Sequence, residues 1–147
     1  MIDRVFDEER ANACDILLTK LIQDERKYDN LIDKDFIVKD YFKNIVKNED
    51  NILFCYEENN TIKGYIYLKF VNNDEKKGYL IDGLYVEEEY RKNGIATKLI
   101  ENALTIVKDV DFIDINVMAH NKDAINLYKK FGFNEFKISL RNRIIDR

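Results

Sequence analysis

The order of three consecutive segments constrains the fold most. A strand-like apolar run is followed by a basic turn that contains a glycine, and the turn is followed by a stretch with helical periodicity. The run is residues 79–86, and the stretch that follows the turn is residues 93–107. The apolar positions of that stretch recur at the spacing of one helix face: Ala96, Leu99, Ala103 and Val107. A second apolar run occupies residues 112–118. A strand, a helix and a strand in this order predict a parallel pair with a right-handed crossover.

The remaining segments predict hairpins and further helices. Residues 52–56 and 62–71 are expected to be strands joined by a turn at Asn59 and Asn60, and residues 2–6 a short strand. Helical spacing of Ala13, Ile16, Leu17 and Leu21 predicts a helix near the N-terminus, and residues 36–46 and 121–131 predict two more. Gly132 ends the last helix, and residues 133–140 are expected to be a final strand. The prediction is an α/β (α+β) fold with a mixed, mostly antiparallel sheet flanked by helices.

Residues 90–97, called the glycine turn below, join the strand to the helix of the parallel unit. The first N–H groups of a helix lack internal partners, and the helix dipole adds partial positive charge there, so the position is suited to an anion. Arg91 and Lys92 add charge, and Gly94 has no Cβ to hold a phosphate away from the backbone. The glycine turn therefore predicts a phosphate-binding site.

Two sequence patterns carry a family resemblance. The glycine turn contains Arg-x-x-Gly-x-Ala, and residues 121–133 contain Asn-x-x-Ala-x-x-Leu-Tyr-x-x-x-Gly-Phe. Both patterns, in this order, resemble the GCN5-related N-acetyltransferase (GNAT) family, in which the first is the acyl-CoA pyrophosphate loop. The resemblance implies the acyl-CoA N-acyltransferase fold, in which the strand before the loop splays from its parallel neighbour.

The resemblance also implies which residues bind acetyl-CoA. The main chain around Leu84, Tyr85 and Val86 would bind the pantetheine arm and the thioester carbonyl, where a backbone N–H can stabilise an oxyanion. The resemblance assigns the pyrophosphate to the main chain of Arg91, Lys92, Asn93, Gly94, Ile95, Ala96 and Thr97. Asn121 would bind the pantetheine arm, and as the residue that opens a helix it is also a candidate N-cap. The glycine turn has the alternative of a surface turn with a cap at Asn93.

Catalytic roles follow from the same resemblance. Tyr128 is implied as the general acid, because a phenol of pKa about 10 can protonate a departing thiolate whose conjugate acid has a pKa of about 8.5. The alternative is a half-buried aromatic residue. Ribosomal-protein N-terminal acetyltransferases of the family carry a glutamate where this chain has Asn116. That departure argues against their peptide substrate. Asp82 and Asp114 remain two candidates for the general base, and each has the alternative of a structural carboxylate.

Composition bounds the kind of protein. The 147 residues, 46% of them hydrophobic, suit a single domain spanning residues 1–147. A formal charge of −4 argues against a nucleic-acid partner, and no apolar run approaches the roughly 20 residues that a membrane helix requires. Charged residues interrupt the first ten positions, so no signal peptide is expected and the cytoplasm is the expected compartment. Cys14 and Cys55 are expected to be buried, reduced thiols, and His120, the single histidine, gives no metal-ligand spacing.

These observations predict an N-acetyltransferase that moves an acetyl group directly from acetyl-CoA to a primary amine, without a metal, as a monomer or homodimer. The alternative is a non-catalytic acyl-CoA-binding regulatory module. Four aromatic residues could line an acceptor cleft or pack in the core: Tyr41, Phe42, Tyr65 and Tyr67.

Overall fold

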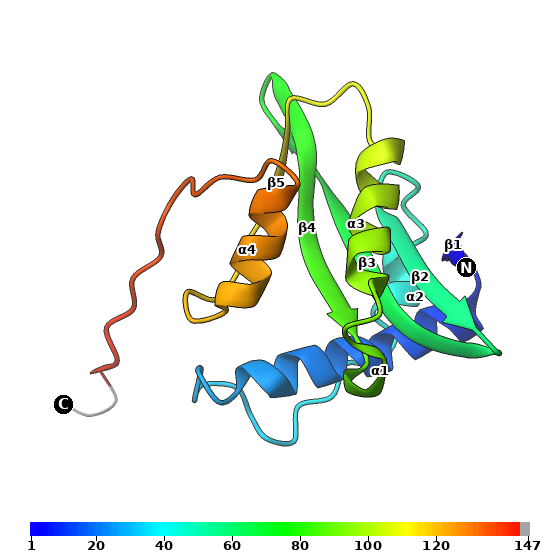
Figure 1. The fold of residues 1–147 in the computed structure, drawn as a ribbon, viewed down its shortest axis with the longest axis horizontal. Helices are drawn as coiled ribbons and strands as arrows, with labels where there is room; N and C mark the ends of the chain where they lie inside the picture. The colour runs from blue at the N-terminus through cyan, green and yellow to red at the C-terminus, as the bar shows by residue number, and fades with distance from the viewer. Residues whose placement is uncertain (145–147) are drawn as a thin grey trace. The chain divides into compact units, whose positions relative to one another are not determined.

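The computed structural model describes residues 1–144, and this part of the chain contains one five-stranded sheet in the order β1-β2-β3-β4-β5. The strands are β1 (Ile2–Arg4), β2 (Ile52–Glu58), β3 (Thr61–Asn73), β4 (Lys76–Val86) and β5 (Phe112–Ile115). Neighbours from β1 to β4 are antiparallel, and β4 pairs with β5 in parallel. The predicted mixed sheet with one parallel pair is confirmed (Figure 1).

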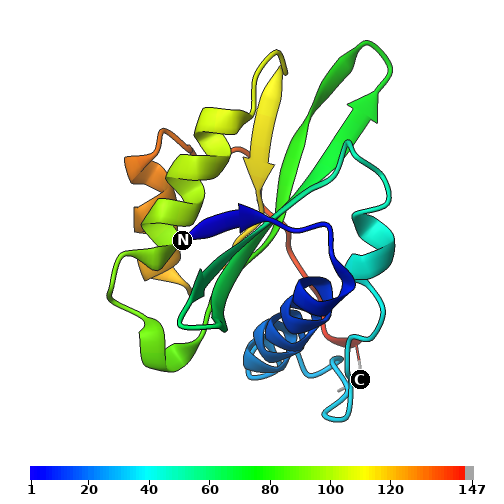
Figure 2. The same ribbon diagram turned by 90° about the vertical axis from the view of Figure 1, so that its right-hand side faces the viewer.

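The chain forms two compact units, Met1–Asn116 and Val117–Arg147. The first contains the sheet and the helical elements α1 (Glu8–Glu25), α2 (Phe42–Ile45), η1 (Glu88–Tyr90) and α3 (Ile95–Ile106). In this unit α1 and α3 lie on opposite faces of the sheet (Figure 2). The second unit contains α4 (Lys122–Lys130).

Each face of the sheet buries its own set of apolar residues. On the α1 side the buried cluster contains Ala11, Cys14, Leu17, Phe42, Leu53, Cys55, Tyr65, Tyr67 and Tyr85. On the α3 side the helix buries Ile95, Leu99, Ile100 and Ala103. Each large buried apolar side chain contributes on the order of 2 kcal/mol, so these two layers hold the first unit together.

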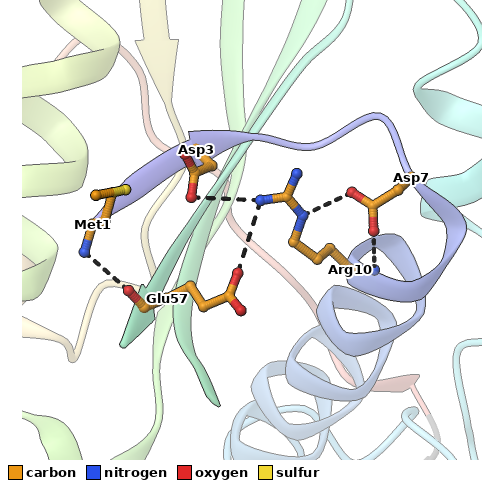
Figure 3. Close-up of polar contacts among 5 residues, drawn as sticks. All are labelled: Met1, Asp3, Asp7, Arg10 and Glu57. Carbon is orange, nitrogen blue, oxygen red and sulfur yellow. Dashed lines mark hydrogen bonds and ion pairs between the residues drawn. The ribbon is translucent and has the colours of Figure 1, made fainter. Parts of the chain in front are cut away.

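Arg10 fastens the start of α1 to the sheet (Figure 3). Its guanidinium lies 2.7 Å from Asp7, 3.5 Å from Asp3 of β1 and 3.8 Å from Glu57 of β2. The Asp7 side chain accepts the backbone N–H of Arg10 and is the N-cap of the helix. Burial opposes ionisation of Asp7, but the hydrogen bonds from Arg10 outweigh it and lower the pKa of Asp7.

One predicted element and one predicted helix face are wrong in the first unit. The helix expected over residues 36–46 is reduced to Phe42–Ile45, because Asp40 adopts a positive φ of 58° that ends any helix before it. The expected inward stripe of the first helix also shifts. Ile16 is 60% exposed, whereas Asp15 is 4% exposed and lies among the buried positions.

The second unit confirms one prediction and contradicts another. Asn121 is the N-cap of α4, and Gly132 follows the helix with a φ of 93°, as expected for a residue that ends a helix. Residues 133–140 do not form a strand. Their apolar alternation indicates a pleated face, but a strand also requires a neighbour for its backbone hydrogen bonds, and none pairs with this segment among the described residues. The side chains of Phe136, Ile138 and Leu140 are at least 85% exposed.

Candidate active site

The end of β4 is the centre of the candidate site in the first unit. The parallel ladder joins Gly78–Ile81 of β4 to Phe112–Ile115 of β5 and stops there. Beyond Ile81, β4 pairs only with β3 in the described part of the chain. The main chain of Leu84, Tyr85 and Val86 therefore borders no strand on one side, which is the splayed arrangement expected for these residues.

A β-bulge places Asp82 at the point where the two strands separate. Tyr67 is opposite Gly83 and Leu68 is opposite Ile81, so Asp82 is the extra residue of β4. Such a bulge redirects the side chain of the extra residue and increases the local twist. Gly83 beside it is required, because a Cβ there would lie 2.7 Å from the Tyr65 hydroxyl.

The surroundings of Asp82 are aromatic. The rings of Tyr41 and Tyr67 meet edge to face with centroids 6.4 Å apart. Desolvation raises the pKa of Asp82, although the positive charge of Lys69 partly opposes the shift. Burial raises the pKa of both tyrosines, and the Asp82 carboxylate adds to each shift. Asp82 is thus a carboxylate with raised proton affinity among phenols that stay protonated at neutral pH.

The Tyr65 hydroxyl is a second unusual group at the bulge. Tyr65 is fully buried, and its hydroxyl has no hydrogen-bond partner among the described residues. Burial, and next the nearby Cys14, raise the pKa of this tyrosine. A buried, unpartnered hydroxyl costs stability.

Asp114, the other predicted base, is exposed on β5 and is paired in register with Leu80 of β4. It therefore lies in the paired part of the two strands, before the point where they separate. Asp82, by contrast, lies at the bulge where the strands separate, and its pKa is raised.

The glycine turn has the geometry of an anion site. Lys92 and Gly94 have φ values of 67° and 78°. Gly94, not Asn93, is the N-cap of α3, and it makes no side-chain cap hydrogen bond. The amides of Ile95, Ala96 and Thr97 precede the first intrahelical bond, which Lys98 donates to Gly94. A Cβ at Gly94 would meet no atom within 4 Å, so the space beside this residue is open.

Arg91 differs from the rest of the glycine turn, because its guanidinium already has partners. Its Nε donates to the carbonyl of Val86 at 2.8 Å, and its terminal nitrogen lies 3.6 Å from the Asp24 carboxylate of α1. The guanidinium also lies over the Tyr85 ring, 5.0 Å from its centroid. No local pattern in the sequence indicates that Asp24 contacts this turn, since Asp24 and Arg91 are far apart along the chain.

Asn121 and Tyr128 belong to the second unit. The Asn121 side-chain oxygen accepts the backbone N–H of Ala124 at 3.2 Å, which is the N-cap role named as an alternative. The Tyr128 ring meets Phe133 edge to face at 6.2 Å. Burial raises the pKa of Tyr128 above its usual value, so its hydroxyl carries a proton at neutral pH.

Three polar side chains of α1 were missed by sequence reasoning. Asp15, Thr19 and Gln23 recur every four residues and bind the backbone of residues 33–42, called the 33–42 loop below. The Asp15 carboxylate accepts the N–H groups of Tyr41 and Phe42 at 3.3 and 3.0 Å. The Thr19 hydroxyl accepts the N–H of Val38, and the Gln23 amide donates to two carbonyls of the loop. This i, i+4, i+8 spacing was the available signal.

Other features of the described residues limit the chemistry. Cys14 and Cys55 are both free and buried, as expected, and burial raises the pKa of each thiol. Residues 1–144 hold no group of three or more His, Cys, Asp or Glu side chains placed to bind a metal ion. Within the same residues, no helix has the length and apolar character needed to span a membrane. Two surface hollows, one beside Phe6 and one at the turn between β3 and β4, contain none of the predicted site residues.

The family follows from the fold, the splayed strands and the glycine turn together. The model of the acetyltransferase (GNAT) family matches residues 17–133, and the chain belongs to this family.

Individual relatives agree with this assignment. An N-alpha-acetyltransferase of Sulfurisphaera tokodaii is 32% identical over 110 residues, which are 67% of this chain and 65% of the relative. An N-alpha-acetyltransferase of Sulfolobus acidocaldarius is 36% identical over 78 residues, which are 51% of this chain and 46% of the relative. This chain thus spans less than two thirds of the length of either relative.

A solved structure supports the fold. A mutant of the BH1408 protein from Bacillus halodurans superposes with a TM-score of 0.82 at 21% identity, covering 99% of both chains. At this level of identity the likeness concerns the fold alone.

Proposed function

We propose that this protein is an acetyl-CoA-dependent N-acetyltransferase that moves an acetyl group directly to a primary amine. One observation carries the proposal beyond family membership. The ladder between β4 and β5 ends at Ile81, directly before the bulge at Asp82, and the same strand leads into an uncapped helix N-terminus with open space at Gly94. A thioester and a pyrophosphate of one ligand can be bound along such a continuous stretch of backbone.

In this proposal, different residues bind different parts of acetyl-CoA. Amides of the glycine turn (Arg91, Lys92, Asn93, Gly94, Ile95, Ala96 and Thr97) hold the pyrophosphate, and the free main chain of Leu84, Tyr85 and Val86 binds the pantetheine arm and the thioester carbonyl. Asn121 is proposed to bind the pantetheine arm through the part of its amide that the N-cap bond does not use.

Proton transfer is assigned to two groups. Asp82, directly or through a water, takes the proton of the acceptor ammonium, and the free amine then attacks the thioester carbonyl carbon. A backbone N–H of β4 stabilises the negative charge that develops on the carbonyl oxygen. When the carbon–sulfur bond breaks, Tyr128 donates its proton to the leaving thiolate, and the second proton that the nitrogen loses as the amide forms passes through water and restores the Tyr128 phenol. The raised pKa of Asp82 supports its role, because a carboxylate of higher proton affinity is a stronger base.

The acceptor is proposed to bind beside Asp82, with the partly exposed Tyr41 as an aromatic wall, whereas Tyr67 is buried in the core. An ammonium group is attracted both by a carboxylate and by the faces of aromatic rings. The two relatives are N-alpha-acetyltransferases, so a protein N-terminus is the first acceptor to test. Asn116, which replaces the glutamate of the ribosomal-protein enzymes, makes a small-molecule amine the second.

Further properties are proposed from the family match and the composition. Residues 1–147 are proposed to act as one N-acetyltransferase domain, because the family match runs through both compact units. We propose a cytoplasmic protein, monomeric or homodimeric, with no nucleic-acid, membrane or metal partner. The charge of −4 supports the first of these exclusions.

Calorimetric titration with acetyl-CoA, followed by release of free thiol in the presence of a panel of amines and N-terminal peptides, tests the proposal. Micromolar binding with transfer to a panel member is the expected result. Binding without transfer would favour a regulatory module, and absence of binding would contradict the proposal.

Tyr128→Phe tests the assigned acid. The variant should lower kcat by about a hundredfold and leave acetyl-CoA affinity nearly unchanged, because only the proton donor is lost. Tyr79→Phe, which removes a hydroxyl elsewhere in the chain, is the matched control. An unchanged kcat in Tyr128→Phe would remove this residue from the mechanism.

A further inference from the structure

A second row of charged residues on α1 faces the segment that leads into the glycine turn. Lys20 and Asp24 are four residues apart on the helix, and their partners Glu87 and Arg91 are also four residues apart. Lys20 forms an ion pair and hydrogen bond with Glu87, whose side chain is 17% exposed. Two ion pairs thus join the second half of α1 to residues 87–91.

The contact between Asp24 and Arg91 is part of a closed triangle. Arg91 lies over the Tyr85 ring, the Asp24 carboxylate lies near enough to Tyr85 to raise the pKa of its hydroxyl after burial, and Asp24 lies 3.6 Å from Arg91. The guanidinium is therefore held toward α1 by a carboxylate, although it follows directly on the strand whose end leads into the anion site.

The triangle is weak enough to open. The Asp24 and Arg91 side chains are 59% and 44% exposed, and exposed pairs of this kind contribute little because water screens them. A pyrophosphate carries more negative charge than one carboxylate and can accept two parallel hydrogen bonds from a guanidinium.

We propose that Asp24 competes with the pyrophosphate of acetyl-CoA for Arg91, so that donor binding releases the last turn of α1. The inference rests on the proposed placement of acetyl-CoA at the glycine turn. In the free protein Asp24 holds Arg91, and in the complex Arg91 turns to the phosphates while Lys20 and Glu87 keep the helix attached.

The release has a consequence for the acceptor side. The same half of α1 carries Thr19 and Gln23, which hold the 33–42 loop and through it the backbone leading to Tyr41. Donor binding would therefore loosen the loop that borders Asp82. Helix α1 therefore couples the donor site to the acceptor site, and the coupling depends on the ion pair between Asp24 and Arg91.

Calorimetry with CoA on Asp24→Asn tests the competition. Because the variant removes a competitor and a repelling charge, CoA should bind about two- to fivefold more tightly than to the wild type. Glu8→Gln is the control, since it breaks an ion pair with Lys43 at the other end of the same helix and should leave CoA affinity unchanged. Unchanged or weaker binding by Asp24→Asn would overturn the inference.

Hydrogen exchange gives a readout without turnover. In the wild type, CoA should speed amide exchange in residues 20–25, and free Asp24→Asn should already exchange at the faster rate. Slower or equal exchange on CoA binding would overturn the inference.

The variant Gly94→Asp distinguishes failure of the proposed donor site from failure of the proposed competition by Asp24. If wild type binds CoA and Gly94→Asp does not, the glycine turn is the donor site, and a failed Asp24 test then counts against the competition alone. If Gly94→Asp binds normally, the placement of the donor fails, and the inference fails with it.

Discussion

The glycine turn and the 33–42 loop are both irregular segments beside the candidate site, but they are held in opposite ways. The glycine turn offers its own backbone amides, and its conformation depends on positive φ angles at Lys92 and Gly94. The 33–42 loop is fixed by side chains of α1, above all by the buried Asp15. A site built from main chain tolerates changes of side chain, whereas a loop held by side chains does not. Substitutions in the two segments should therefore have different signatures.

The largest effect is expected on the acceptor side, from Asp82→Asn. The amide keeps the shape of the side chain but cannot take a proton, so kcat/KM for the amine should fall by about a hundredfold or more. CoA affinity, measured by calorimetry, should stay close to that of the wild type. The matched variant Asp114→Asn, on the paired part of β5, should retain most activity. The reverse ranking would identify Asp114 as the base.

The effect of Asp82→Asn on stability should also depend on pH. Because the pKa of Asp82 is raised in the folded protein, its protonated form is favoured there, and ionisation costs stability as pH rises through the folded pKa. Asp82→Asn should thus be more stable than the wild type at pH 7, and the difference should vanish below about pH 4, the usual aspartate pKa. Thermal unfolding across this pH range measures it. An advantage that grows toward low pH would contradict the raised pKa.

Asp15→Ala is expected to have the next largest effect, on stability. The change leaves the N–H groups of Tyr41 and Phe42 without their acceptor, so the free energy of unfolding should fall by about 1–3 kcal/mol. Denaturant unfolding measures the loss. Asp35→Ala, in the same loop but exposed, should change stability by no more than about 0.5 kcal/mol. Equal effects would mean that the loop does not depend on α1.

Gly94→Asp should weaken CoA binding by about tenfold or more, because a carboxylate would stand where the phosphates bind. Gly94→Asn separates charge from backbone conformation, since asparagine also tolerates a positive φ but carries no charge. Calorimetry should place Gly94→Asn between the wild type and Gly94→Asp. Equal affinities for all three would contradict the anion site.

The smallest effect is expected from Lys92→Ala. If amides hold the pyrophosphate, this exposed side chain contributes only screened charge, and CoA affinity should fall by about two- to fivefold. The loss should shrink further at high salt. Lys108→Ala, beyond the other end of α3, is the control. A loss of a hundredfold would show that side chains, not main chain, make the site.

The contrast between the two segments explains what the sequence could predict. A main-chain site needs a glycine, a helix start and neighbouring charge, and all of these are visible in residues 90–97. The Asn59-Asn60 turn was likewise predictable, and both residues have the positive φ that the turn requires. Such features depend on neighbours in the chain.

What could not be predicted depends on contacts between distant residues. The helix expected over residues 36–46 has helical spacing, but its start is set by Asp15 on another helix. The bulge at Asp82 is a property of the register between β3 and β4, which no local pattern specifies. The strand expected over residues 133–140 has the right alternation but, among the described residues, no partner to complete it. The roles of Asn121 in ligand binding and of Tyr128 in catalysis stay predictions.

At the bulge, β4 has one residue more than the paired segment of β3, and this affects which deletions the sheet can tolerate. Removal of Asp82 by deletion would leave Ile81 and Gly83 on alternate faces, as an ordinary ladder requires, and would not disturb the pairing on either side. Deletions inside a strand usually invert every side chain that follows. Here a one-codon loss would remove the proposed base and leave the sheet in register. A catalytically silent descendant could thus arise from this chain in one step, and a gap at this position would identify it.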